Sequence, residues 1–314
     1  INNLEFIKFL NEFVKIKINY DLMLRLIRKY HSFDTINYFF ELMSENILIN
    51  PPEYFFFDII KYGPNKKILE LFVENEIIFN KLKYYNLHFE ENILHRICRM
   101  RPQIYLIDKL INKKDLMSNI NSSNGNTPLH YLMLHNYINP NLIDKFKSQV
   151  NIKNNSGKKP LEILCSKQTG YFGIRYLFFL TNLKSIRLLV RFTFDNETKI
   201  NSIKNIIRDL NNYVLFPTSG YYVSNISRVY SIIKVFIEEG TIINNDILNQ
   251  SEMIKPSINS IIKLLIKNGL SITKKSNVNE RIKKYYKNFL KTKSRIIYNL
   301  GYFNKDIISI IIQY

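Results

Sequence analysis

Histidine and cysteine are the residue types here that could bind a metal ion or transfer a proton, and the chain has five and two of them. His95 and Cys98 are three residues apart, so a helix would place both on one face. A structural zinc site needs four ligands, and no second pair lies nearby in the sequence. His130 and His135 are five residues apart, which is not the spacing of a helical zinc pair. We therefore predict no metal site and no cofactor.

The motifs of common enzyme active sites do not stand out. The nine glycines form no glycine-rich phosphate loop, and we find neither a G-x-S-x-G nucleophile elbow nor a pair of catalytic carboxylates. A catalytic site can assemble from distant residues, but nothing in the sequence supports one. We predict a protein that is not an enzyme and has no catalytic residues.

Lysine and arginine give the chain a formal net charge of +19 at pH 7. Nine of them crowd into residues 274–295, interleaved with Tyr285, Tyr286, Phe289 and Leu290. Such a segment could bind nucleic acid or an acidic membrane, with the aromatic rings stacking on bases. Alternatively, an A/T-rich genome raises Lys together with Ile, Asn, Tyr and Phe, and the aromatic residues form the buried face of a solvated helix. Nucleic acid is therefore an alternative partner and not the expected one.

The segment from Gly125 to His130 contains several signals for a turn that leads into a helix. Gly125 supplies a turn conformation that other residues resist. Thr127 can cap the helix, and Pro128 suits a first helical position, where its nitrogen needs no hydrogen bond. Leu129 begins an apolar helical face. The pattern returns 32 residues later at Gly157, Pro160 and Leu161.

This pattern resembles the ankyrin-repeat family, whose period is about 33 residues and whose signature is T-P-L-H. Leu94 and His95 hold the same register, 35 residues before Leu129 and His130. The resemblance implies pairs of antiparallel helices, joined by hairpins and stacked in a solenoid. It implies that His95 and His130 tie hairpin to helix by hydrogen bonds, and that Cys98, Met133 and Cys165 share one small apolar position. A partner protein would contact the hairpins, here at Asn121, Ser122, Asn124, Lys153, Asn154 and Asn155.

Each ankyrin unit ends in a second helix, and about seven such helices can be found before residue 274. In the last two, Gly240 and Gly269 fall where a left-handed helix C-cap is expected. Residues 1–34 are helical by pattern and are expected to cap the solenoid. Residues 166–231 hold the weakest pattern, and we expect longer helices or an inserted loop there. Turn signals in that region occur at Asn211–Asn212, Pro217–Thr218 and Ser219–Gly220.

The end of the chain resembles the opening of an F-box, in which a Leu-Pro pair precedes an acidic residue and an apolar helix. Poxvirus ankyrin proteins carry a truncated F-box-like element, the PRANC domain, at the same place. Phe303 and Asn304 stand where the family has Leu and Pro, so its best-known mark is absent. Alternatively, these residues form a final helix that seals the solenoid. The residues that carry the resemblance are Phe303, Asp306, Ile307, Ile308, Ile311 and Ile312.

Together, these observations predict an all-α ankyrin-repeat solenoid over residues 1–273, followed by a basic helix and an F-box-like element over residues 274–314. No apolar run approaches the ~18 residues needed to span a bilayer, and two cysteines make no disulfide framework. We expect no membrane partner and an intracellular protein, in the host cytoplasm or the nucleus. The resemblance implies a viral adaptor that captures a host protein and recruits a Skp-type subunit of a cullin ubiquitin ligase. The alternatives are sequestration of the host protein without a ligase, and nucleic-acid binding.

Overall fold

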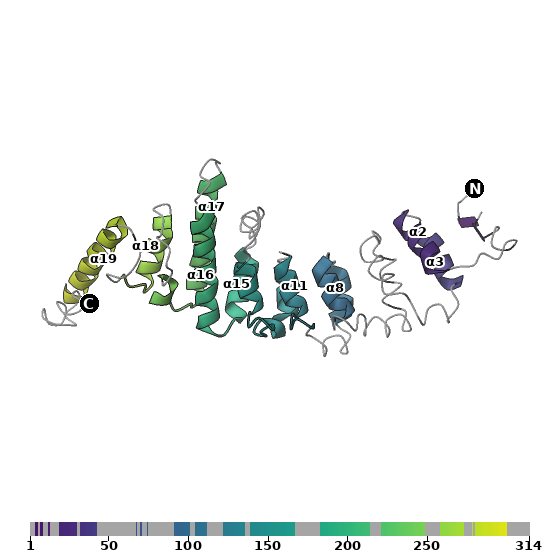
Figure 1. Cartoon of the computed structure of the whole chain (residues 1–314), viewed down its shortest axis with the longest axis horizontal. Helices are drawn as coiled ribbons and strands as arrows, with labels where there is room; N and C mark the ends of the chain where they lie inside the picture. The colour runs from purple at the N-terminus through teal and green to yellow at the C-terminus, as the bar shows by residue number, and fades with distance from the viewer. Residues whose placement is uncertain are drawn as a thin grey trace. The chain divides into compact units, whose positions relative to one another are not determined.

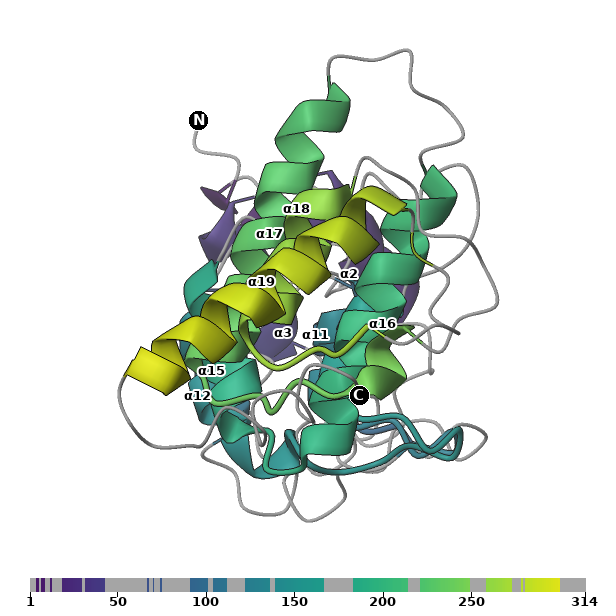
Figure 2. The ribbon, with the colours of Figure 1, turned by 90° about the vertical axis from the view of Figure 1, so that its left-hand side faces the viewer.

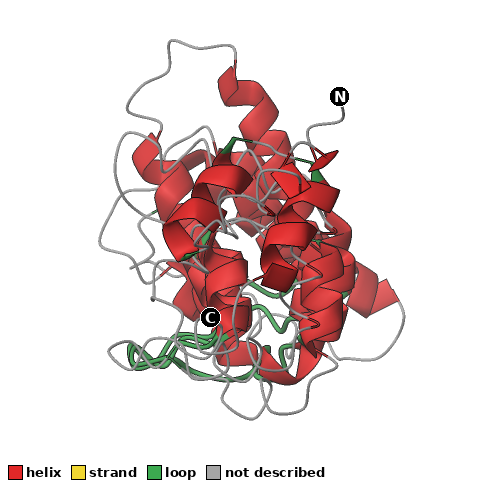
Figure 3. Ribbon diagram, turned by 90° about the vertical axis from the view of Figure 1, so that its right-hand side faces the viewer, coloured by secondary structure: helices red, strands yellow, loops and turns green. Residues whose placement is uncertain are grey.

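In the described part of the computed structural model, all regular secondary structure is helical. The structure describes residues 4–5, 7–8, 12, 19–29, 32–42, 67, 70, 74, 91–100, 104–111, 122–135, 139–166, 183–213, 221–248, 258–272, 278 and 280–299. Within these ranges no strand occurs, as the colours of Figure 3 show. This confirms the all-α prediction for the described part of the chain. None of its helices is both long and apolar enough to cross a bilayer.

The chain divides into two compact units, which we describe separately. The first comprises Ile1–Tyr137 and Asn141–Pro160, and the second comprises Ile138–Pro140 and Leu161–Tyr314. The change of sequence character that we expected at residue 274 therefore lies inside the second unit.

The first unit begins with two helices that pack on each other, α2 (Tyr20–Arg28) and α3 (Phe33–Leu42). Asn19 starts α2, since its side-chain oxygen accepts a hydrogen bond from the Leu22 amide at 2.9 Å. Ile27 of α2 and Ile36 of α3 are fully buried. The predicted helical N-terminal region is thus confirmed where it is described.

Four further helices of this unit surround the repeated motif: α8 (Ile93–Met100), α9 (Ile104–Ile111), α11 (Pro128–Leu134) and α12 (Pro140–Lys145). A short 3-10 helix, η1 (Lys147–Gln149), follows α12. Helix α8 packs on α9 and on α11, its neighbour in Figure 1. Leu94, Cys98, Leu129 and Met133 have no exposed surface. The same register in α8 and α11 therefore builds their shared core.

The second unit contains helix α15 (Leu183–Phe192), the long helices α16 (Asn196–Tyr213) and α17 (Tyr221–Glu238), α18 (Asn259–Lys267) and α19 (Glu280–Asn299). The short helix η2 (Asn245–Leu248) lies between α17 and α18, and α13 (Pro160–Cys165) spans the boundary between the units. Helix α17 packs on α15, α16 and α18, and α18 packs on α19. The 18-residue helices α16 and α17 confirm the longer helices that we expected in this region.

The turn predicted at Asn211–Asn212 is wrong, because α16 continues to Tyr213. Ile203, Ile207 and Leu210 form a buried stripe along this helix, which packs on α17. Burial of that stripe outweighs the weak helix propensity of asparagine. The signals at Pro217–Thr218 and Ser219–Gly220 lie outside the described residues.

Helices α17 and α18 end in the same way, at the two glycines that the sequence singled out. Gly240 has φ +77° and Gly269 has φ +113°. The Thr241 amide donates to the Phe236 carbonyl, and the Leu270 amide donates to the Leu265 carbonyl, both at 3.0 Å. These are the bonds of a Schellman C-cap, so the predicted left-handed caps are confirmed.

Candidate protein-binding surface on two hairpin loops

Helix α11, which starts within the T-P-L-H segment, begins with a reciprocal cap. The Thr127 hydroxyl oxygen accepts a hydrogen bond from the His130 amide at 3.3 Å. The His130 ring returns the bond, since its Nδ1 accepts from the Thr127 amide at 3.1 Å. This arrangement confirms Thr127 as the cap of α11 and satisfies amides that a helix start would otherwise leave without partners.

The other ring nitrogen of His130 reaches the next loop along the chain. Its Nε2 lies 3.0 Å from the carbonyl oxygen of Lys158. A carbonyl can only accept, so Nε2 carries the proton and Nδ1 stays free to accept from Thr127. Burial lowers the pKa of His130 from 6.5 to about 4. The ring is therefore neutral near pH 7 and acts as a structural link, as expected.

His95 holds the corresponding place at the start of α8. Its Nδ1 accepts from the Asn92 amide at 3.2 Å, and the Asn92 side-chain oxygen accepts from the amides of Leu94 and His95. Both residues of the pair are buried. The two histidines of the signature position thus close the first turn of two different helices.

Two hairpin loops, residues 122–126 and residues 154–158, have the same internal hydrogen bonds at an offset of 32 residues. The Ser122 amide donates to the Asn126 carbonyl, and the Asn154 amide donates to the Lys158 carbonyl, both at 3.0 Å. The Gly125 amide donates to the Ser122 carbonyl at 2.7 Å, and the Gly157 amide donates to the Asn154 carbonyl at 2.8 Å. Gly125 has φ +68° and Gly157 has φ +71°. The two loops are therefore one structure, repeated.

Hydrogen bonds also hold the two loops against each other. The Asn155 amide donates to the Asn124 carbonyl at 3.1 Å, and the Asn155 side chain donates to the Ser123 carbonyl at 2.8 Å. The Asn154 side chain donates to the Asn126 side-chain oxygen at 2.9 Å. Figure 2 shows the paired loops as teal tubes at the lower right. The pairing makes a continuous surface from loops that are far apart in sequence.

Gly125 is required by this pairing as well as by its own conformation. A side-chain carbon added there would lie 2.3 Å from the Asn155 Oδ1 atom and 2.7 Å from its backbone nitrogen. The same carbon added at Gly157 would meet nothing within 4 Å. The first loop therefore needs glycine for close approach, whereas the second needs it only for the turn.

The predicted partner-binding residues divide into exposed and structural ones. Asn124, Lys153 and Asn155 are exposed, together with the neighbouring Ser123 and Ser156. Ser122 is 4% exposed, and its hydroxyl oxygen accepts a hydrogen bond from the Asn126 amide, so this side chain has a structural role in the loop. Asn154 also has a structural role, because its side-chain oxygen accepts from the amides of Ser156 and Lys158. Asn121 lies outside the described residues.

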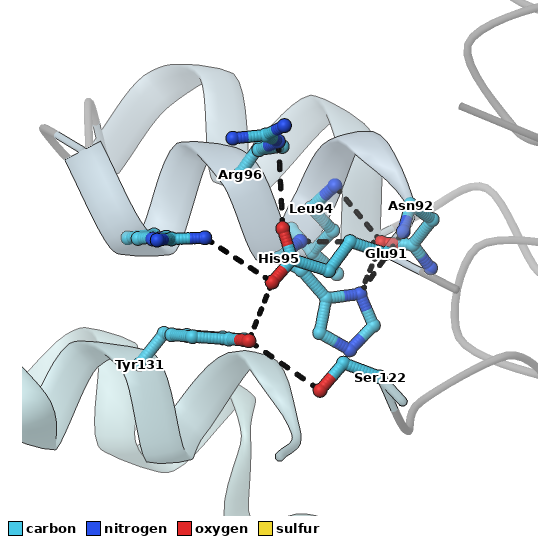
Figure 4. Close-up of polar contacts among 8 residues, drawn as sticks. Glu91, Asn92, Leu94, His95, Arg96, Ser122 and Tyr131 are labelled. Carbon is cyan, nitrogen blue, oxygen red and sulfur yellow. Dashed lines mark hydrogen bonds and ion pairs between the residues drawn. The ribbon is translucent and has the colours of Figure 1, made fainter. Parts of the chain in front are cut away.

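A buried polar cluster joins α8 to α11 and was not anticipated from the sequence. Glu91, which is 3% exposed, accepts a hydrogen bond of 2.5 Å from the Tyr131 hydroxyl. Arg96 and Arg99 lie 3.4 Å and 3.5 Å from its carboxylate oxygens. Burial and the bond to Glu91 raise the pKa of Tyr131. Figure 4 shows Glu91 between Arg96 above and Tyr131 below.

The cluster places charged and polar groups between α11 and the start of α8. Every charged group has an opposite charge or a hydrogen-bond donor facing it, which a buried carboxylate needs. The His95 and Tyr131 rings are perpendicular, with a centroid distance of 6.0 Å. Two sequence features could have indicated this cluster: the acidic Glu91 directly before the cap residue Asn92, and the aromatic Tyr131 directly after His130.

Cysteine and histidine build no metal site within the described ranges, where no group of three or more His, Cys, Asp or Glu residues is close enough to hold an ion. Burial raises the pKa of the Cys98 thiol well above its usual value and that of Cys165 to about 12. Both thiols therefore stay protonated and behave as small apolar side chains.

The predicted F-box-like residues, Phe303, Asp306, Ile307, Ile308, Ile311 and Ile312, lie outside the described residues. Comparisons of the chain with protein-family models, curated proteins and solved structures find no match.

Proposed function

We propose that this chain is a divergent ankyrin-repeat protein that binds a partner protein through its hairpin loops. The observation that carries the proposal is the pair of loops at residues 122–126 and 154–158, which repeat the same hydrogen bonds 32 residues apart. The ankyrin family would produce an offset of this size, together with the capped T-P-L-H helix α11 and the matching Asn92 and His95 cap of α8. The proposal extends this architecture to a solenoid along the chain.

The paired loops suit protein recognition because they are rigid and polar. Hydrogen bonds between the loops hold the exposed Asn124 and Asn155 in place, and the exposed Lys153 directly precedes the second loop. A preorganised surface loses little entropy when it binds, which favours affinity. Loops on a rigid scaffold are also where binding residues are commonly found.

An adaptor is a better match to these features than an enzyme. The strongly shifted pKa values of His130 and Cys98 belong to side chains buried in helix packing. Such groups stabilise the fold and cannot reach a substrate. We propose that the captured molecule is a host protein and that the tail recruits a Skp-type subunit of a cullin ligase, with sequestration as the alternative.

The capture step can be tested by quantitative affinity purification from host cells. The variant Asn124→Glu with Lys153→Glu reverses the charge of the exposed loop surface. The variant Lys147→Glu with Ser148→Glu makes the same charge change on η1, where both side chains are exposed. The loop variant should lose the captured protein at least tenfold, and the η1 variant should keep it. Equal retention by the two variants would contradict the proposal.

Deletion of residues 297–314 tests the ligase step separately. If the tail docks a ligase subunit, the deletion should abolish its co-purification, and the loops should still hold the host protein. Sequestration instead predicts that the full-length chain brings down no Skp or cullin subunit.

A further inference from the structure

Helix α19 has an apolar face and a basic face on opposite sides. Ile282 is fully buried, and Tyr285, Tyr286 and Phe289 on the same side are half-buried. This side packs on α18, where the Lys263 ammonium lies 5.0 Å from the Tyr285 ring centroid. Figure 2 shows α19 in yellow, crossing in front of α18.

The opposite side carries a stripe of exposed cations at Arg281, Lys284, Lys287 and Lys291. Successive members are three or four residues apart, so they share one face at intervals of about 4.5–6 Å along the axis. Glu280 is the one acid among the 20 residues of the helix, and its ion pair is with Lys283 at 2.9 Å. Within the described ranges, none of the four stripe residues forms an ion pair. Among the described residues, the stripe therefore presents positive charge that no acid pairs with.

The chemistry of the stripe favours nucleic acid over the other anionic partners. A helix that lies on a membrane must insert an apolar face, and the apolar face of α19 is packed on α18. A duplex carries one phosphate charge per about 1.7 Å of its axis when both strands are counted, a density that gives a row of cations several anions to neutralise.

We infer that α19 binds the phosphate backbone of nucleic acid through Arg281, Lys284, Lys287 and Lys291, without reading sequence. This role is separate from protein capture by the hairpin loops. The +19 net charge would draw the polyanion to the chain, and the stripe would be the contact. The half-buried aromatic residues act in helix packing and not as stacking platforms.

The experiment measures binding of a fluorescent 24-base-pair duplex of random sequence by anisotropy, across a salt series. The test variant is Lys284→Gln, Lys287→Gln, Lys291→Gln, since Gln keeps good helix propensity. The matched control is Lys29→Gln, Lys147→Gln, Lys184→Gln, which removes the same charge from exposed side chains elsewhere. Circular dichroism checks that both variants keep the wild-type helix content.

The wild-type chain should bind more weakly as salt rises, and the test variant should lower the log–log slope by about 0.9 for each phosphate that it no longer neutralises. The control should keep the wild-type slope. The inference is overturned if the duplex does not bind, or if both variants reduce the slope equally, which would show that net charge alone attracts the duplex. It is also overturned if vesicles of phosphatidylcholine and phosphatidylserine bind and the duplex does not.

Discussion

The single ring of His130 links two elements of the first unit. Nδ1 accepts from Thr127 at the start of α11, and Nε2 lies 3.0 Å from the Lys158 carbonyl in the second loop. Protonation of Nδ1 would remove the lone pair that accepts from the Thr127 amide. The ring can therefore perform both roles only in its neutral form.

This dependence predicts that stability falls in acid. The folded-state pKa of His130 is about 4, below the ordinary 6.5, so the unfolded chain takes up the proton first. Stability is lost as the pH falls from about 6.5 toward 4 and is fully present above that window. Relative to His130→Gln, the wild-type chain should lose about 2 kcal/mol between pH 7.5 and pH 5. Urea denaturation at the two pH values measures this difference.

The exposed His135 provides the control, and His135→Gln should keep the wild-type pH dependence. Parallel curves for the wild-type chain and His130→Gln would rule out this role for His130.

The two loop glycines give a second test at the residue scale. Gly157→Ala should cost about 1–2 kcal/mol, because a side chain at positive φ is strained. Gly125→Ala should cost about 2–4 kcal/mol, since overpacking against Asn155 adds to the same strain. Chemical denaturation of the two variants measures the difference. An equal cost would mean that the loops separate to accommodate the methyl group.

At the scale of elements, apolar burial and one polar contact join α8 to α11. Leu94 and Leu129 are fully buried where the helices pack, and Tyr131 on α11 bonds Glu91 just before α8. A hydrogen bond to a charged group contributes about 1.5–3 kcal/mol. An unpaired buried carboxylate would also be costly.

A double-mutant cycle tests this contact. Tyr131→Phe and Glu91→Gln should each destabilise the chain, and the pair should show a coupling energy of about 1–3 kcal/mol. Ser123→Ala, an exposed loop change, should be additive with either variant. Additivity between Tyr131→Phe and Glu91→Gln would show that the short contact does not determine helix pairing.

At the scale of the whole molecule, the principal helix packings join elements that are close in sequence. Examples are α2 with α3, α8 with α9 and with α11, and α17 with α18. Loops that follow successive helices are joined in the same way. In the second unit, Asn196 exchanges two hydrogen bonds of 2.8 Å with the backbone of Ile242, and Asn245 accepts one from Ser271. For the solenoid that we propose, stability is a sum of local terms and neighbour terms.

A core truncation should therefore act most strongly near its own position. Leu129→Ala should cost about 2–5 kcal/mol and increase hydrogen exchange most in α8 and α11. Leu265→Ala, at an equally buried site in α18, should increase exchange most in α17 and α19. Hydrogen-exchange mass spectrometry of both variants checks this. Uniform increases along the chain in both would contradict local coupling.

The sequence by itself determined the features that depend on residues within one turn or loop. The Thr127 cap, the left-handed glycines and the Gly240 and Gly269 helix ends all follow from spacings of at most five residues. The helical character of the described chain also follows from apolar periodicity. These features were predictable because the interacting groups are close in sequence. Each of these residues also has few backbone conformations that allow the contact.

Only the tertiary structure decided which side chains are exposed and which distant groups meet. Ser122 is a small polar residue of a kind expected at the surface, yet it is buried. Its hydroxyl oxygen accepts hydrogen bonds from the Asn126 amide and the Tyr131 hydroxyl. Tyr131 and Glu91 are 40 residues apart, and Asn155 meets Gly125 across 30. Such contacts depend on how the helices pack, which the local sequence does not determine. Burial of an apolar stripe also outweighed a local turn signal at the end of α16.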